Sequence, residues 1–177
     1  GEKLTETTRN IPGDHNSLKA VAACAAAIKA GASPEQIAAS IPQFTGAGRR
    51  FEILGNVGGV TIADDYAHHP AELKATLETA MNMGYGQVFA VFQPFTYTRT
   101  QMLLDDFARA LQIADKVVMT EIMGSRERAE DYAARTQDPA AKIPGSVWYD
   151  TFDEGVARAM TTARLGTLPL PLARGAN

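Results

Sequence analysis

The sequence has few of the features that tie a protein to a membrane, to nucleic acid or to an oxidising compartment. Its only cysteine, Cys24, has no disulfide partner and lies in the alanine-rich run 20–27, so we expect it to pack as a small hydrophobic residue. No apolar run reaches about 18 residues and no signal peptide is recognisable, so neither a membrane partner nor secretion is expected. The 17 basic and 20 acidic residues give a net charge of -3 without a basic block, which argues against nucleic acid as a partner. Such a composition is typical of a cytoplasmic protein.

A phosphate-binding loop of the form Gly-x-x-x-x-Gly-Lys-Ser/Thr is also absent from the sequence. In many proteins that loop holds the phosphates of a nucleotide with its backbone N–H groups and its lysine. If this chain takes part in nucleotide chemistry, we expect the loop to be supplied from elsewhere.

The sequence does contain enough apolar residues for a sizeable core, with 45% hydrophobic and 21% charged residues. From Val60 onward, apolar runs typical of strands alternate with apolar residues at helical spacing. This alternation predicts an α/β fold with a mostly parallel sheet, flanked by helices and joined by right-handed crossovers. The expected strands are 51–56, 60–63, 87–92, 116–120 and 146–149, the expected helices are 71–83, 100–114 and 152–162, and 129–141 is expected to be a surface helix or loop.

Two helices are expected before this α/β part. An alanine-rich helix from about residue 17 to residue 30 is followed by Gly31, which suits a helix end. Ser33 and Pro34 suit the cap and the first position of a second, short helix. The two patterns together predict a short N-terminal helical hairpin.

The densest group of chemically active side chains is Asp64-Asp65-Tyr66-Ala67-His68-His69-Pro70. Gly58 and Gly59 predict a hairpin turn into the strand before it, and Pro70 suits the first turn of the helix after it. The polar side chains are therefore expected at the carboxyl end of a strand, where open α/β sheets bind ligands. A turn in which an aspartate caps the helix and the histidines are solvated accounts for the spacing equally well.

The tail from about residue 165 is atypical for such a fold. It reads Leu-Gly-Thr-Leu-Pro-Leu-Pro-Leu-Ala-Arg-Gly-Ala-Asn. Pro169 and Pro171 lack the N–H group that a central strand needs for its hydrogen bonds, so an ordinary strand is not expected here.

The string Asp64 to Pro70, together with Arg49-Arg50-Phe51-Glu52, closely resembles the Mur ligases of peptidoglycan synthesis, over roughly residues 11–160. The resemblance implies that residues 1–43 end a central ATP-binding domain. It also implies that residues 44–177 form the C-terminal, Rossmann-like domain, with the tail as its atypical part.

Within that family the resemblance is to members that use ATP to join L-alanine to UDP-N-acetylmuramate through an acyl phosphate. It implies ATP and Mg²⁺ as cofactors, with the principal magnesium ligands outside this chain. The remaining central and N-terminal domains would be partners in the same protein, and this chain alone would be inactive. Two alternatives stay open: a ligase of the same family that recycles murein tripeptide, against which Tyr66 argues, and a non-catalytic α/β module that binds a nucleotide or a substrate.

The resemblance also implies a nucleotide site. His15 and Asn16 match the family pattern Gly-x-His-Asn-x-x-Asn beside adenine, where an amide both donates and accepts. Lys19 replaces the second asparagine of that pattern and can only donate. Arg50 would reach the phosphates as a catalytic cation, and Asp65 would accept the ribose hydroxyls.

The amino-acid side of the site would be formed by Tyr66, His68 and Arg99. Tyr66 and His68 are expected to face the incoming amino acid, with His68 catalytic, and Arg99 is expected to hold that substrate. Thr96 stands where the family commonly has a further arginine. His69 is expected to be an orienting or structural residue.

Overall fold

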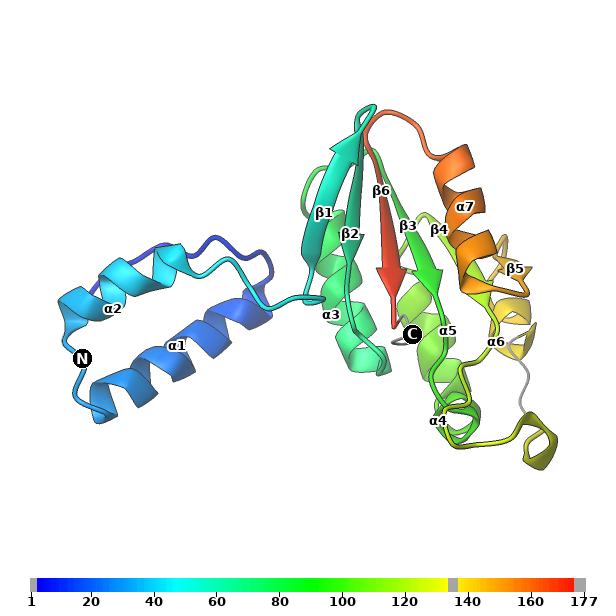
Figure 1. The fold of residues 1–177 in the computed structure, drawn as a ribbon, viewed down its shortest axis with the longest axis horizontal. Helices are drawn as coiled ribbons and strands as arrows, with labels where there is room; N and C mark the ends of the chain where they lie inside the picture. The colour runs from blue at the N-terminus through cyan, green and yellow to red at the C-terminus, as the bar shows by residue number, and fades with distance from the viewer. Residues whose placement is uncertain (1–2, 134–136, 174–177) are drawn as a thin grey trace.

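The computed structural model describes residues 3–133 and 137–173 (Figure 1). A pair of helices lies at one end of the molecule, beside an α/β part that holds the described strands. The helical pair consists of α1 (Asp14–Lys29), α2 (Pro34–Ser40) and the 3-10 turn η1 (Ile41–Gln43). The predicted helical hairpin is therefore present, with its first helix beginning at Asp14.

Local signals explain where these helices begin and end. Ser33 caps α2 because its hydroxyl accepts the N–H of Gln36, while the Gln36 side chain accepts the N–H of Ser33. Gly31 follows α1 with a φ of 97°, a conformation that glycine adopts without strain. The cap and the stop that the sequence predicted both lie at the expected positions.

The next element is the antiparallel hairpin of β1 (Glu52–Val57) and β2 (Val60–Asp64). Gly58 and Gly59 form its turn with φ values of 59° and 80°, as a tight hairpin turn requires. The strand β2 ends on Asp64, which is buried, so the polar residues that follow it start from a fixed strand end.

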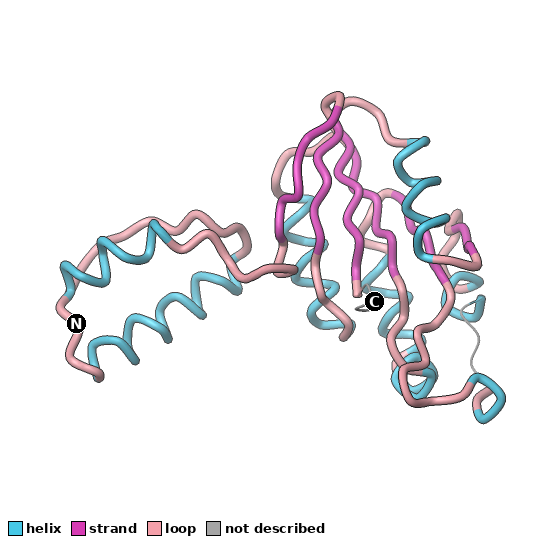
Figure 2. The backbone as a smooth tube through the Cα atoms, in the orientation of Figure 1, coloured by secondary structure: helices cyan, strands magenta, loops and turns pink. Residues whose placement is uncertain are grey.

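The main sheet is parallel and has the order β5-β4-β3-β6, which confirms the predicted α/β class (Figure 2). An isolated parallel bridge between Asp65 and Leu172 joins the end of β2 to the end of β6, so the hairpin extends this layer. The carboxyl ends of these strands therefore meet at one edge. The bounds are β3 (Gln87–Phe92), β4 (Lys116–Thr120), β5 (Val147–Tyr149) and β6 (Thr167–Leu172).

Helices cover both faces of the sheet. Val88, Ala90 and Phe92 of β3 belong to a core cluster that includes residues of α3 (Pro70–Met81) and α5 (Leu104–Leu111). Phe89 and Val91 belong to a second cluster beneath α7 (Phe152–Thr162). This alternation along one strand is why the run 87–92 is apolar throughout.

The predicted helix 100–114 is wrong in one respect, because the structure has two helices there, α4 (Tyr97–Met102) and α5. The backbone of Leu103, with φ −114° and ψ 22°, leaves the helical region between them. The break lets α5 pack Phe107 and Leu111 into the core while α4 stays at the carboxyl edge of the sheet.

The expectation that the tail would not form an ordinary strand is also wrong, since β6 is a fully buried strand beside β3. The carbonyl of Pro171 accepts the N–H of Asp65, whereas the carbonyl of Leu172 accepts the N–H of Gln93, just after β3. Successive residues of a strand direct their backbone groups to opposite sides, so Pro169 and Pro171 face away from β3. Their missing N–H groups therefore cost no hydrogen bond in the parallel ladder.

Part of the sequence predictions lies outside the described residues, namely 134–136 of the segment 129–141 and 174–177 of the tail. The described parts of the former segment are η2 (Ala129–Asp131) and α6 (Gln137–Ala141). None of the helices in the described part of the chain combines the length and apolar character that a bilayer crossing needs.

Gly155 tests how closely α7 packs on the sheet. A Cβ atom at this position would lie 2.7 Å from Cγ2 of Thr120 and 3.2 Å from Cγ1 of Val118. We expect Gly155→Ala to lower the free energy of unfolding by about 1–2 kcal/mol, because overpacking outweighs the better helix propensity of alanine. Urea unfolding would measure this, with Gly55→Ala as the control, since nothing lies within 4 Å of that Cβ position. If the two variants were equally stable, the contact between α7 and the sheet would accommodate the extra methyl group at no cost.

Candidate functional site

The four residues expected to contact a nucleotide line one pocket. His15 and Asn16 come from α1, Arg50 from the segment before β1, and Asp65 from the position just after β2, around a volume of about 330 Å³. Lys19, Glu72 and Thr76 add further polar side chains to its lining. The fold therefore brings together residues that are up to fifty positions apart in the sequence.

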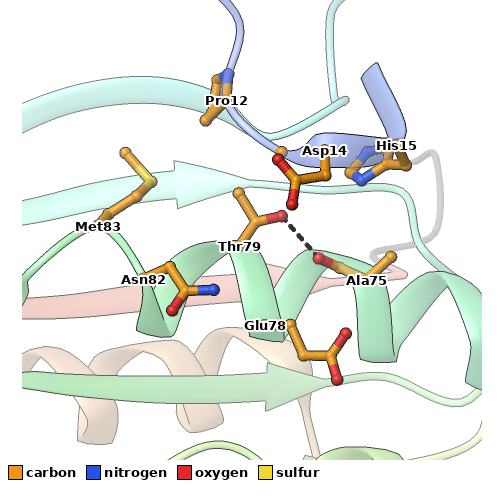
Figure 3. Close-up of a pocket in the computed structure, with 9 residues that line it drawn as sticks. Pro12, Asp14, His15, Ala75, Glu78, Thr79, Asn82 and Met83 are labelled. Carbon is orange, nitrogen blue, oxygen red and sulfur yellow. Dashed lines mark hydrogen bonds between the residues drawn. The ribbon is translucent and has the colours of Figure 1, made fainter. Parts of the chain in front are cut away.

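A second pocket, of about 600 Å³, adjoins the first between α1 and α3 and shares His15 with it (Figure 3). Asp14, Glu78 and Asn82 give it polar walls. Burial and the nearby Lys19 lower the pKa of His15, so its ring is neutral at pH 7 and offers one donor and one acceptor. The second pocket therefore extends the polar space next to the nucleotide residues.

The amide of Asn16 is already partly committed within the fold. Its Nδ2 atom donates to the carbonyl of Pro12 at 2.6 Å, which leaves the Oδ1 atom as an acceptor toward the pocket. Lys19 adds a side chain that only donates. Donors and acceptors are thus both present here, although the second amide of the family pattern is absent.

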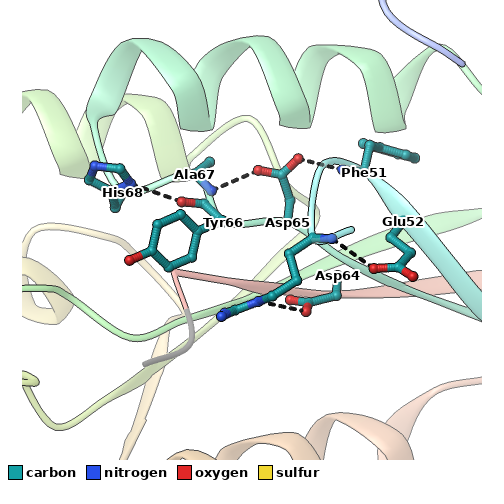
Figure 4. Close-up of polar contacts among 8 residues, drawn as sticks. Phe51, Glu52, Asp64, Asp65, Tyr66, Ala67 and His68 are labelled. Atoms are coloured by element: carbon teal, nitrogen blue, oxygen red, sulfur yellow. Dashed lines mark hydrogen bonds and ion pairs between the residues drawn. The ribbon is translucent and has the colours of Figure 1, made fainter. Parts of the chain in front are cut away.

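Asp65 joins the segment before β1 to the loop after β2 (Figure 4). Its Oδ2 atom accepts the N–H of Phe51 and its Oδ1 atom accepts the N–H of Ala67, each at 2.7 Å. The residue is 6% exposed, and this burial raises the pKa of the Asp65 carboxyl, against the opposing effect of the two N–H groups and of Arg50. Asp65 therefore has a structural task besides any contact with a ligand.

The segment 49–51 is held in an unusual conformation that leaves Arg50 exposed at the pocket. Arg49 and Phe51 have φ values of 58° and 49°, which are costly for residues with a side chain. The N–H of Arg49 donates to Glu52, and the carbonyl of Arg49 accepts the N–H of Tyr66. These bonds and the one from the N–H of Phe51 to Asp65 hold the segment in the conformation that places Arg50 in the pocket lining.

Arg49 has partners of its own within the site. Its Nε atom lies 3.2 Å from Oδ2 of Asp64, and its guanidinium carbon lies 4.8 Å from the centre of the Tyr66 ring. A guanidinium held between a carboxylate and an aromatic face is well positioned to fix that ring. The structure thus gives Arg49 a supporting position beside Tyr66, distinct from that of Arg50.

Tyr66 and His68 lie together after β2, with ring centres 5.2 Å apart (Figure 4). The Nδ1 atom of His68 is 2.9 Å from the carbonyl oxygen of Tyr66, so it donates a proton there and leaves the Nε2 atom as an acceptor. His69 instead caps α3, because its ring accepts the N–H of Ala71. The two histidines therefore serve different purposes.

Arg99 lies on α4, at the carboxyl edge of the sheet, and does not line the nucleotide pocket. Thr96 caps this helix by accepting the N–H of Arg99. Among the described residues, the buried Nη1 atom of Arg99 has no hydrogen-bond partner. A buried guanidinium donor without a partner suits an anionic ligand such as a carboxylate.

Glu72 is the polar residue of this region that the sequence analysis missed. It lies in the first turn of α3, lines the pocket with Arg50, and accepts the N–H of His68. The sequence did contain a signal for this contact: Glu72 lies three residues after the helix cap His69, and an acid at that position commonly accepts backbone N–H groups. In the described part of the chain, no group of three or more His, Cys, Asp or Glu residues is arranged to hold a metal ion.

The sequence comparisons identify the class of protein to which this fold and site belong. The model of the family described as "Mur ligase, glutamate ligase domain" matches residues 49–173. This range includes Arg50, Asp65, Tyr66, His68 and Arg99, whereas His15 and Asn16 of α1 precede it. The chain belongs to the Mur ligase family.

The curated relatives point to one member of the family. The UDP-N-acetylmuramate–L-alanine ligase of Clostridium novyi is 47% identical over 127 residues, which is 72% of this chain and 28% of that protein. The enzyme of the same name from Lachnospira eligens is 42% identical over 87% of this chain and 34% of its own length. The chain thus spans about a third of the length of these relatives.

Solved structures agree with this relationship. The UDP-N-acetylmuramate-alanine ligase of Thermotoga maritima matches with a TM-score of 0.76 and 25% identity, over 99% of this chain and 38% of that one. A murein peptide ligase of Psychrobacter arcticus matches with a TM-score of 0.66 and 25% identity, over 94% and 35%. Both matches include the helical pair as well as the α/β part.

Proposed function

We propose that this chain forms part of an ATP-dependent ligase that joins L-alanine to UDP-N-acetylmuramate in peptidoglycan synthesis. The observation that supports it best is the convergence of His15, Asn16, Arg50 and Asp65 on one pocket. The names of the relatives supply the substrates, since two thirds or more of this chain matches proteins named for that reaction.

The donor set suits a magnesium-bound nucleotide. The exposed guanidinium of Arg50 can neutralise phosphate charge, and the carboxylate of Asp65 keeps free lone pairs that can accept ribose hydroxyls. Asn16 and His15 would contact the base. ATP would supply the phosphoryl group that activates the carboxylate of UDP-N-acetylmuramate, and Mg²⁺ would be held mainly by residues outside this chain.

The other part of the site would hold the amino acid. The guanidinium of Arg99, whose Nη1 atom has no hydrogen-bond partner in the described part of the chain, would bind the carboxylate of L-alanine. The Nε2 atom of His68 would accept a hydrogen bond from its amino group. In this proposal His68 and Arg50 are the catalytic residues, and Tyr66 would contact the amino acid beside His68.

The division of the chain belongs to the same proposal. Residues 1–43 would complete a central domain, and 44–177 would form the C-terminal domain. The phosphate-binding loop, which the sequence lacks, would come from the central domain, and an N-terminal domain would hold the UDP-sugar. Alone, the chain would be inactive, and the protein would act in the cytoplasm, where the nucleotide substrates are available.

A chimera would test the function. Residues 3–173 would replace the matching part of the Thermotoga maritima ligase, and ADP release would be followed with UDP-N-acetylmuramate and either L-alanine or murein tripeptide. We expect L-alanine to be the preferred acceptor. We also expect Arg50→Ala in the chimera to reduce kcat/KM for ATP by about 10- to 100-fold, the usual effect of losing one charged hydrogen bond.

Cooperative unfolding of the chimera must be shown first, so that a lack of activity cannot be attributed to misfolding. A folded chimera that uses neither acceptor would contradict the ligase proposal and favour a non-catalytic binding module. Preference for the tripeptide would instead favour the recycling ligase, the second candidate that the Psychrobacter match supports.

A further inference from the structure

Glu72 touches His68 in two ways. One of its carboxylate oxygens, Oε2, accepts the backbone N–H of His68 at 3.0 Å and lies 3.5 Å from the Nδ1 atom of the same residue. The carboxylate thus spans the first turn of α3 and the loop after β2, and it holds that loop against the helix.

The second contact bears on the proton of the His68 ring. A carbonyl oxygen can only accept, so the 2.9 Å contact with the Tyr66 carbonyl already places a proton on Nδ1. An ionised carboxylate 3.5 Å from the same nitrogen favours that proton further. In the neutral ring, the Nε2 atom then keeps its lone pair.

Glu72 is ionised under the conditions in which His68 would work. Burial raises the pKa of its carboxyl, but hydrogen bonds and charges around it, the backbone N–H of His68 first among them, have the opposite effect, and the pKa lies below its usual value. Among the charged groups nearby, Lys19, Arg50 and Asp65 line the adjoining pocket with Glu72, and Arg49 lies against the Tyr66 ring.

Glu72 lies between the two parts of the proposed site. It lines the pocket that contains Arg50 and Asp65, and its carboxylate contacts His68, which lies outside that pocket. The residue therefore lies between the nucleotide residues and the amino-acid residues. Its contacts with His68 are to the backbone N–H and to Nδ1, so it can influence the amino-acid residues only through His68.

We propose that Glu72 is a positioning residue that sets the Nδ1-protonated form of the His68 ring, so that Nε2 faces the incoming amino group as an acceptor. The inference rests on the proposed function for the identity of that amino group. The contacts that carry it are those of Glu72 and Tyr66 with one ring nitrogen.

Nitrogen NMR of the histidine rings in the 177-residue chain would test this directly, because the chain has three histidines, which His15→Gln and His69→Gln would assign. We expect Glu72→Gln to keep an acceptor for the His68 N–H but to remove the charge. The ratio of the Nδ1-protonated to the Nε2-protonated neutral ring should then fall by about 2- to 5-fold, from a Coulomb energy of about 0.5–1 kcal/mol in a solvated setting.

The matched control is Glu78→Gln, which removes the same charge from the same helix beside Lys74. It should leave the His68 ratio unchanged. If Glu72→Gln and Glu78→Gln both leave the ratio as it is in the parent chain, Glu72 is only a helix-capping acid and the inference is wrong.

The same substitution in the chimera separates this inference from the ligase proposal. We expect kcat/KM for L-alanine to fall by about as much as the ring ratio does. An active chimera without a ring effect would overturn the role of Glu72 and leave the ligase proposal standing. A ring effect in a folded but inactive chimera would support the positioning by Glu72 and overturn the ligase proposal.

Discussion

Replacing Asp65 with asparagine is expected to lower the free energy of unfolding by about 2–3 kcal/mol. Each carboxylate oxygen accepts one backbone N–H, from Phe51 and from Ala67. Asparagine has one oxygen, so its NH₂ group would face one of these N–H donors inside a buried site. Urea unfolding at pH 7 of Asp65→Asn and the parent chain would measure the loss.

Asp64→Asn is the matched control for this prediction. Asp64 is buried next to Asp65, but only its Oδ2 atom contacts Arg49, while Oδ1 has no partner among the described residues. An asparagine can keep the contact with Arg49 and place its NH₂ group where Oδ1 now lies. Equal losses for the two variants would mean that the paired N–H contacts of Asp65 contribute little.

This result would also affect how binding experiments are interpreted. Loss of nucleotide binding after substitution of Asp65 would combine a lost ligand contact with a disturbed turn before β1. Arg50 is exposed, so Arg50→Ala removes a charge from the pocket without opening the buried network. It is therefore the cleaner probe of the nucleotide site.

Truncation of Leu170 to alanine is expected to lower the free energy of unfolding by about 2–5 kcal/mol, the usual cost of a buried leucine. Leu170 is fully buried in the core cluster beneath α3 and α5, and it pairs with Ala90 of β3. The prediction tests whether β6 belongs to the core. Thermal or urea unfolding would measure it.

Leu165→Ala provides the control, because Leu165 is 84% exposed just before β6. It should change stability by about 0.5 kcal/mol or less. If Leu170→Ala lowered the free energy of unfolding as little as Leu165→Ala, β6 would not be part of the cooperative core. The sequence-based prediction that the tail forms no ordinary strand would then be supported.

The tail shows why the rule that proline disfavours central strands could not predict β6 correctly. Two prolines exclude a strand only if their nitrogen atoms face a partner strand. Pro169 and Pro171 are two residues apart, so both face the same side, and the register with β3 puts that side away from the ladder. Register depends on contacts between distant segments, which the local sequence does not contain.

By itself, the sequence determined the local structure and the kind of chemistry. The cap at Ser33, the turn at Gly58 and Gly59 and the apolar run of β3 lie where short-range patterns predict, because caps, turns and strand periodicity depend on neighbouring residues. The string from Asp64 to Pro70 predicted the family by its resemblance to the Mur ligases, and the family model confirms that prediction.

Only the tertiary structure decided which of these residues act together. It placed His15 of α1 in one pocket with Asp65, and it used Asp65 to hold the segment before β1 that carries Arg50. These relations arise from packing α1 near α3 and from pairing β2 with β6 at one edge of the sheet. They depend on contacts between segments that are distant in the sequence, and local patterns of residue types do not specify such contacts.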